Sequence, residues 1–211
     1  MIQQQYKRTL ERVHEAAVRA GRSPEEVRLM AVSKTVEPPQ IMEAVEAGAL
    51  LLGENKVQEL QQKRAFFPQC AMHLIGHLQS NKAAKAVACA DMIQSVDSVR
   101  IAREISNAAG KCGKTMPVLL EVNIGREAAK FGFLPEQLYD SLSEIATLPG
   151  LKVRGLMTVP PFLEENTEIR KFFSQMYQLF IDIRAKKTDN ICMEILSMGM
   201  SGDFEIAIAE G

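Results

Sequence analysis

The chain has 211 residues, of which 46% are hydrophobic and 24% are charged. This composition is that of an ordinary globular protein and excludes a disordered or fibrous chain. Lys and Arg number 25 against 26 Asp and Glu, so the net charge is -1 and no overall basic field favours nucleic acid as a partner. No apolar run approaches the roughly 18 residues of a membrane span, and the polar N-terminal segment is unlike a signal peptide. We therefore expect a cytoplasmic protein with no nucleic-acid and no membrane partner.

Neither the cysteines nor the histidines form a metal-binding pattern. His73 and His77 are four residues apart in a segment expected to be a strand, where that spacing covers roughly 13 Å and is too long for one ion. The cysteines are far apart, with no C-x-x-C pair, and are expected to be reduced, buried thiols. They are Cys70, Cys89, Cys112 and Cys192. We expect no metal site.

The first element in chain order is a predicted helix. Apolar residues recur at steps of three and four from Ile2 to Ala17 and form one stripe on a helix. Ser23, Pro24 and Glu26 follow with the pattern of a capping box, which predicts a short helical turn.

The rest of the chain alternates short apolar runs with amphipathic stretches. Seven runs predict strands, at residues 29–33, 50–52, 72–76, 92–96, 117–123, 153–159 and 193–198. Strands that alternate with helices pair in parallel, in either a doubly wound sheet or a barrel. The spacing between strand starts, about 20 to 25 residues in the first half, favours a (β/α) barrel. With no linker or repeat in the sequence, we expect residues 1–211 to form one domain.

Lys34 is the residue whose position most clearly suggests chemistry. It directly follows the apolar run 29–33 and precedes Pro38 and Pro39, so it lies at the carboxyl end of the first predicted strand. An amine held against an apolar barrel interior loses hydration, and this favours the neutral form that a Schiff base requires. From the residues alone, a lysine that ends a strand and points into solvent is the simpler interpretation.

Eight segments, taken in order, resemble the successive signatures of the YggS/PROSC proteins. They are residues 31–35 (AVSKT), 53–55 (GEN), 75–82 (IGHLQSNK), 95–98 (SVDS), 122–124 (VNI), 130–133 (KFGF), 154–158 (RGLMT) and 196–201 (LSMGMS). The third and the last are specific to this family rather than to barrels in general. The resemblance implies a pyridoxal 5'-phosphate homeostasis protein with the (β/α)8 TIM-type barrel of the alanine racemase N-terminal domain.

The same resemblance implies a set of cofactor-binding residues. Lys34 matches the lysine that binds pyridoxal phosphate as a Schiff base. Residues at the ends of four other strands would surround the ring, and a loop before a helix expected at residues 203–210 would hold the phosphate at free backbone amides. The strand-end residues are Asn55, His77, Met157 and Ser197, and the loop residues are Ser201 and Gly202. Lys130 is a second lysine in a family motif, and it could take up free aldehyde or simply be solvated.

The family implies a carrier or buffer of the cofactor, with no established catalysis and with pyridoxal phosphate-dependent apoenzymes as partners. The second domain that gives alanine racemase its catalytic tyrosine has no counterpart in this chain. Two alternatives remain open, a racemase-like enzyme and a scaffold that has lost cofactor binding.

The chain departs from the family pattern at its end. Family members continue into an eighth strand reading V-R-x-G-T, whereas this sequence stops at Gly211. We therefore expect a barrel without its eighth strand, with weaker cofactor binding than in a complete relative. Such a chain should be a monomer that can associate through its open barrel edge.

Overall fold

The computed structural model describes residues 1–161 and 166–211. Its seven strands all run parallel, in the spatial order of the sequence. The strands are β1 (Ala31–Val32), β2 (Leu51–Glu54), β3 (Ala71–Leu74), β4 (Met92–Val96), β5 (Met116–Glu121), β6 (Leu151–Met157) and β7 (Ile191–Ser197). Each overlaps one of the seven predicted runs, with ends that differ by at most a few residues. The predicted order of strands is therefore confirmed.

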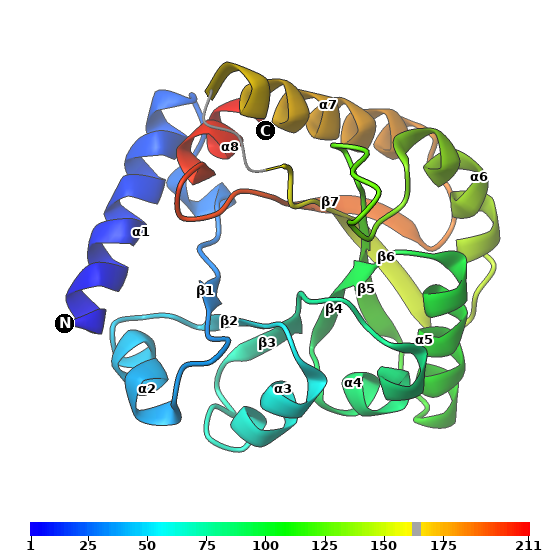
Figure 1. The fold of residues 1–211 in the computed structure, drawn as a ribbon, viewed down its shortest axis with the longest axis horizontal. Coiled ribbons are helices and arrows are strands. Elements are labelled where there is room, and N and C mark those ends of the chain that lie inside the picture. The colour runs from blue at the N-terminus through cyan, green and yellow to red at the C-terminus, as the bar shows by residue number, and fades with distance from the viewer. Residues whose placement is uncertain (162–165) are drawn as a thin grey trace.

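Helices cover the outside of these strands. They are α1 (Ile2–Arg19), α2 (Pro38–Glu46), α3 (Val57–Arg64), α4 (Ala83–Cys89), α5 (Val99–Lys111), α6 (Pro135–Ile145), α7 (Asn166–Ala185) and α8 (Phe204–Glu210), with short 3-10 turns at Pro24–Glu26 and Ser80–Lys82. Figure 1 shows the strands curving around a central axis with the helices arranged as an outer ring. The barrel, and not the doubly wound sheet, is the observed architecture.

The barrel is open between β7 and β1. Among the described residues, no strand pairs with the free edge of either, which agrees with the predicted absence of an eighth strand. On this side α8 lies between α1 and α7 (Figure 1). Its Ile208 packs with Val13 and Ala17 of α1, and its Ala207 packs with Phe173 of α7. On this side of the barrel, the packing of α8 against α1 and α7 therefore takes the place of strand pairing.

The main core lies between the strands and the helices, and a second cluster lies inside the barrel. Side chains such as Leu52, Leu74 and Ile105 are fully buried in the main core. Met92, Leu119 and Met157 form the separate cluster, against which Ile195 packs. Because alternate side chains of a strand point to opposite faces, this second cluster is the apolar floor of the barrel interior.

Gly155 lies where the register between β6 and its neighbours shifts. Its φ of +152° is in the region that favours glycine, and a Cβ placed there would lie 1.7 Å from the carbonyl oxygen of Ile195. The bulge therefore requires glycine at this position.

Two local predictions are wrong in part. The short helical turn after Ser23 is confirmed at Pro24–Glu26, but Ser23 makes no capping hydrogen bond to it; its hydroxyl donates to Glu25, while Glu26 pairs with Arg22. Of the four cysteines only Cys70 is buried, and Cys112 is exposed, because it follows the last turn of α5 on the surface. All four are free thiols, as predicted.

Candidate functional site

The residues predicted to bind the cofactor lie at one end of the barrel. Because all strands are parallel, their carboxyl ends lie on the same side, and this is where barrel enzymes bind ligands. Met157 and Ser197 are the last residues of β6 and β7. Lys34, Asn55 and His77 follow β1, β2 and β3 within three residues of the strand ends. Ser201 and Gly202 lie in the loop before α8.

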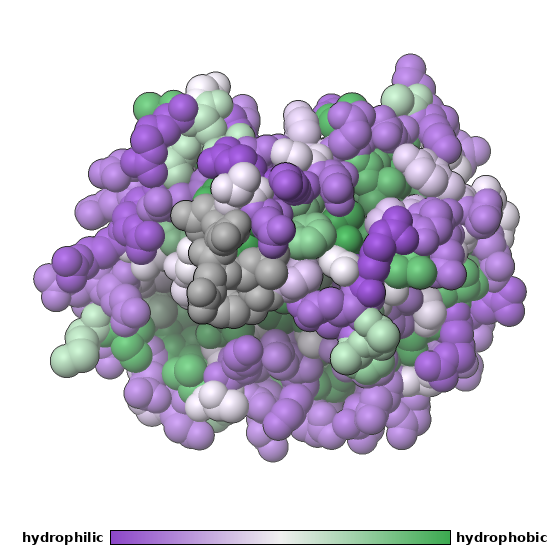
Figure 2. All heavy atoms as spheres, turned by 45° about the horizontal axis from the view of Figure 1, so that its top comes forward, coloured by the Kyte–Doolittle hydropathy of each residue, from purple (hydrophilic) through white to green (hydrophobic). Residues whose placement is uncertain are grey.

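The face at this end of the molecule is hollowed. Figure 2 shows apolar residues in its recessed middle and hydrophilic side chains around its rim. The exposed apolar side chains include Val32, Phe131, Val159 and Met200, all from β1 or from segments that follow the carboxyl ends of strands. An apolar hollow with a polar rim is the usual form of a small-molecule site.

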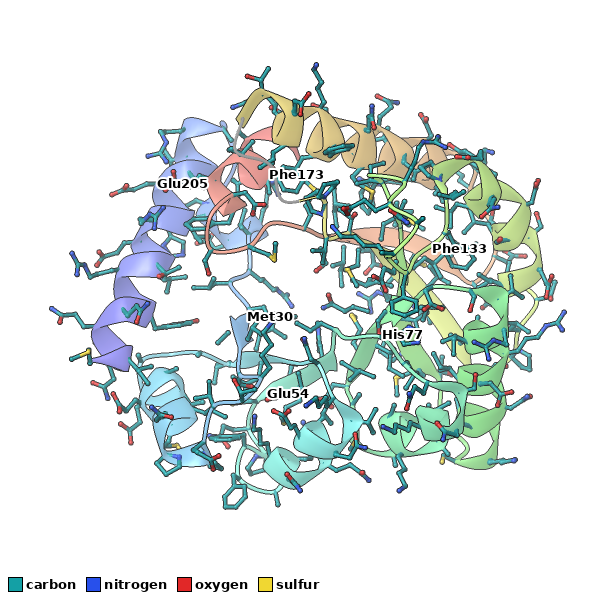
Figure 3. All side chains as sticks on the ribbon, viewed as in Figure 1. Met30, Glu54, His77, Phe133, Phe173 and Glu205 are labelled. Atoms are coloured by element: carbon teal, nitrogen blue, oxygen red, sulfur yellow. The ribbon has the colours of Figure 1, made fainter. Side chains whose placement is uncertain are left out.

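The residues before Lys34 alternate between the two faces of the first strand. The Ser33 hydroxyl donates to Glu54 on the helix-covered side of β2, at 2.6 Å. Since successive side chains of an extended chain point to opposite faces, Met30 and Val32 lie on the interior face, and Lys34 follows them in a turn at the carboxyl end of β1. In Figure 3 Met30 points into the ring of strands, whereas Glu54 points toward α3.

Lys34 is nevertheless exposed, so the prediction of a dehydrated amine is wrong for this structure. The physical reason is the gap between β1 and β7, through which solvent reaches the inner face of β1; Val32 on the same face is 47% exposed. No carboxylate of the described residues forms an ion pair with Lys34. Its amine is therefore accessible and is not held by an ion pair within the described chain.

A chain of hydrogen bonds crosses the barrel interior and includes Ser197. The Ser197 hydroxyl donates to Gln94 Oε1 on β4 at 2.7 Å, and Gln94 Nε2 lies 2.8 Å from Nδ1 of His73 on β3. Burial lowers the pKa of His73 to about 4, so the ring is neutral near pH 7 and Nδ1 accepts the amide proton. Gln94 thus fixes the orientation of Ser197. The sequence contains one indication that Gln94 has a role, because it is an amide side chain within an otherwise apolar strand.

His77 lies at the rim, but its ring is already in contact with other side chains. Its Nδ1 lies 2.8 Å from Asp97, and its ring stacks on Phe131, with the centroids 3.6 Å apart. Figure 3 shows His77 close to the ends of β4 and β5. A contact between His77 and a ligand is therefore limited to the ring edge at Nε2 or to the other ring face.

Glu121, the last residue of β5, is a titratable group that the sequence analysis did not identify. Burial, and secondarily the charge of Asp97, raises the pKa of its carboxyl to about 7. Its neighbour Leu120 belongs to the main core, so Glu121 faces the interior side of the strand. The structure therefore places a carboxyl that titrates near neutral pH at the carboxyl end of the barrel.

Asn55 is positioned by a close approach between β2 and β3. A Cβ on Gly76 would lie 2.3 Å from the backbone oxygen of Asn55, so the chain beyond β3 passes directly over this residue. Only glycine permits that distance. Asn55 is partly exposed and follows Glu54, whose side chain is fully buried on the opposite face.

The loop before α8 and the segment around Lys130 differ in how far their polar groups are satisfied. Ser201 and Gly202 are exposed, and within the described chain their backbone N–H groups donate to no acceptor. Lys130, in contrast, pairs with Glu127 and donates to the carbonyl oxygen of Pro160 at 3.0 Å. Lys130 is thus committed to its own loop, whereas the loop before α8 presents free donors.

Comparisons with known proteins show the family to which the chain belongs. The family model described as the N-terminal domain of alanine racemase matches residues 9–210. A pyridoxal phosphate homeostasis protein of Aquifex aeolicus is 39% identical over 206 residues, covering 97% of this chain and 90% of the relative.

Two solved structures are similar over nearly the whole chain. A crystal structure of a protein from Bifidobacterium adolescentis, described as unknown, superposes with a TM-score of 0.94 at 38% identity and covers 100% of this chain and 90% of that one. PipY of Synechococcus elongatus, solved with pyridoxal phosphate bound, gives a TM-score of 0.82 at 34% identity, with 94% of each chain covered.

Proposed function

Because the chain belongs to the alanine racemase N-terminal domain family and is similar throughout to pyridoxal phosphate homeostasis proteins, we propose that it binds pyridoxal 5'-phosphate and takes part in homeostasis of this cofactor. Lys34 is the amine proposed to hold the cofactor as a Schiff base. The observation that carries the proposal is an accessible lysine at the carboxyl end of β1, with no ion-pair partner among the described residues. Bound pyridoxal phosphate would supply a carbonyl for this amine and an electron-accepting ring.

The surrounding residues fit a planar, phosphorylated ligand. The free N–H groups of Ser201 and Gly202 and the Ser201 hydroxyl are suitable donors for a phosphate. Met157 belongs to the apolar floor, and the Ser197 hydroxyl, oriented by Gln94, keeps its lone pairs for a polar edge of the ring. Asn55 and His77 complete the proposed set at the ends of β2 and β3.

We propose a carrier role without catalytic turnover, with apoenzymes that require the cofactor as recipients, in a monomeric cytoplasmic protein formed by one domain over residues 1–211. The names of the relatives support the homeostasis role. Glu121 is the residue that best argues for the racemase-like alternative, because its carboxyl titrates near neutral pH. Incubation with alanine in heavy water separates the two. If deuterium appears at the alpha carbon at a rate that depends on Glu121, the carrier role is refuted and the racemase-like enzyme is supported.

The proposed Schiff base is tested by titration with pyridoxal phosphate, followed by borohydride reduction and peptide mapping. Wild type should develop the visible absorption of an imine and carry the reduced label on the peptide that contains Lys34. Lys34→Ala should lose that label, and Lys56→Ala, which removes an exposed lysine near the end of β2, should keep it. Absence of any absorbance change in wild type would favour the scaffold alternative, and label at Lys34 in none of the proteins would refute the assignment.

A further inference from the structure

A buried ionic network lies directly behind Lys34, on the helix-covered face of β1. Lys63 of α3 places its ammonium 2.8 Å from Glu54 and 2.7 Å from the carbonyl oxygen of Ser33. The Ser33 hydroxyl donates to the same Glu54 oxygen at 2.6 Å. The Lys63 side chain is 8% exposed and that of Glu54 is completely buried. The network thus fixes both the carbonyl and the side chain of the residue that precedes Lys34.

The residue after Lys34 is held by the same helix. Thr35 has a φ of 60°, which is unfavourable for a β-branched residue. Its backbone N–H donates to Glu59 at 2.9 Å, and Glu59 lies 3.3 Å from Lys63. This backbone hydrogen bond is the main reason why the pKa of Glu59 is lowered. A strained conformation that persists must be held by its surroundings, and here the carboxylate of Glu59 holds it.

A buried ion pair is weak evidence for a purely stabilising role, because the loss of hydration offsets most of the attraction. The second oxygen of Glu54 also has no hydrogen-bond partner among the described residues, which an arrangement selected for stability alone would not favour. The contacts of the network converge instead on the two peptide units that flank Lys34. Since β1 has only two residues in its ladder, the backbone has few other constraints at this point.

We propose that Glu54, Lys63 and Glu59 are positioning residues for Lys34: they clamp the backbone on both sides of it and so fix where its amine is presented at the carboxyl end of β1. The inference rests on the proposed binding of pyridoxal phosphate. It assigns to α3, a helix outside the barrel, control over a reactive group at the carboxyl end of β1. The network itself does not touch the ligand.

The clamp is tested by measuring hydrogen exchange at the Thr35 amide without ligand and the affinity for pyridoxal phosphate in the same variants. Glu59→Ala removes the anchor of Thr35 and leaves the buried pair intact. Its Thr35 amide should exchange faster, and its apparent Kd should rise, each by roughly tenfold or more, as expected for the loss of a charge-assisted hydrogen bond. Lys56→Met is the matched control, since it removes the exposed partner of the same carboxylate; both quantities should stay within about twofold of wild type.

The double variant Glu54→Met, Lys63→Met separates positioning from stability. Replacing both charges by apolar side chains of similar size should leave a folded protein with a melting temperature near that of wild type. It should still bind the cofactor more weakly and give less label on Lys34 after reduction. Reverting both substitutions to Glu54 and Lys63 should restore the affinity for the cofactor and the label on Lys34.

The outcomes are distinct. Wild-type affinity in both Glu59→Ala and the double variant, with label on Lys34, would overturn the clamp and leave the proposed function intact. A wild-type protein that forms no imine would remove the proposed function and the positioning role with it, while the exchange rate of Thr35 still reports the backbone contact. If the double variant does not fold, Glu59→Ala decides, because Glu59 lies at the edge of the network.

Discussion

The two sides of the barrel are held together in different ways. On one side β5, β6 and β7 have six, seven and seven residues and form a long ladder, with register shifts, over an apolar floor. On the other side β1 has only two residues, and it is an edge strand, as β7 is. Beyond this short pairing, the ionic network of Glu54, Lys63 and Glu59 contacts the chain there. The proposed reactive lysine thus lies on the side where strand pairing is short and side-chain contacts add to it.

This difference predicts how each side responds to substitution. Changes in the ladder of β5 to β7 should affect the free energy of unfolding and leave Lys34 in place. Changes in the network near β1 should affect the position of Lys34, with a loss of stability that a second substitution can restore. The following variants test the two halves of this statement, beginning with the largest effect.

Gly155→Val should damage the ladder most. A side chain at φ +152°, with its Cβ 1.7 Å from the Ile195 carbonyl oxygen, forces β6 and β7 apart. We expect a loss of about 4 kcal/mol or more in the free energy of unfolding, measured by urea denaturation. Gly110→Ala in α5 is the control, because a Cβ there meets nothing within 4 Å, and it should gain about 0.5 to 1 kcal/mol. An unchanged urea midpoint for Gly155→Val would show that the pairing of β6 and β7 adapts to a side chain more easily than its geometry indicates.

Lys63→Met should be the next largest change, and it acts on the β1 side. It leaves the completely buried Glu54 carboxylate without its cation, which should cost about 3 kcal/mol in the same urea assay. Lys56→Met, which removes an exposed ion pair, should change the free energy of unfolding by less than about 1 kcal/mol. A loss equally small in both variants would mean that the Glu54 site takes up water or a proton without difficulty.

Glu121→Gln, at the carboxyl end of β5, should alter how the free energy of unfolding depends on pH. The carboxyl has a pKa of about 7 in the folded protein against 4.5 in the unfolded chain, so the folded state binds the proton more tightly. Its contribution is fully present below pH 4.5 and is lost as the pH rises through about 7. The Gln variant should therefore be more stable than wild type by about 3 kcal/mol near pH 8, with the difference vanishing near pH 4.

The order of elements could be predicted from the sequence because it depends on local periodicity. The run at residues 92–96 matches β4, and the apolar stripe of the first helix matches α1. The barrel was favoured by the spacing of the strands, and its open side was implied by the resemblance to the family. Prediction was weaker for exposure. Lys34 was expected to be dehydrated, but solvent access depends on the gap beside β1, which no local pattern encodes.

The site was predictable as a set of strand ends, but its side-chain contacts were not. The stacking of His77 on Phe131 joins residues 54 positions apart in the chain, and the bond from Ser197 to Gln94 joins residues still farther apart. Lys63 gave little signal, because α3 is rich in polar residues and a lysine on such a helix is usually solvated. A carboxylate at the end of an apolar strand, such as Glu54, was the one local indication of a buried partner.

Ser98→Ala should give the smallest effect and sets the scale for a change confined to one helix end. The Ser98 hydroxyl accepts from the Ile101 N–H at the start of α5, at 3.4 Å, and donates to Asp97 at 2.9 Å. Loss of a cap with so long a hydrogen bond should lower the free energy of unfolding by about 0.5 to 1 kcal/mol. Because α5 packs on the ladder side, the exchange rate of the Thr35 amide should be unchanged, although Asp97 also pairs with His77. Faster exchange at Thr35 in this variant would show that the two sides of the barrel are coupled at the carboxyl ends of the strands. The two sides would then not respond independently to substitution.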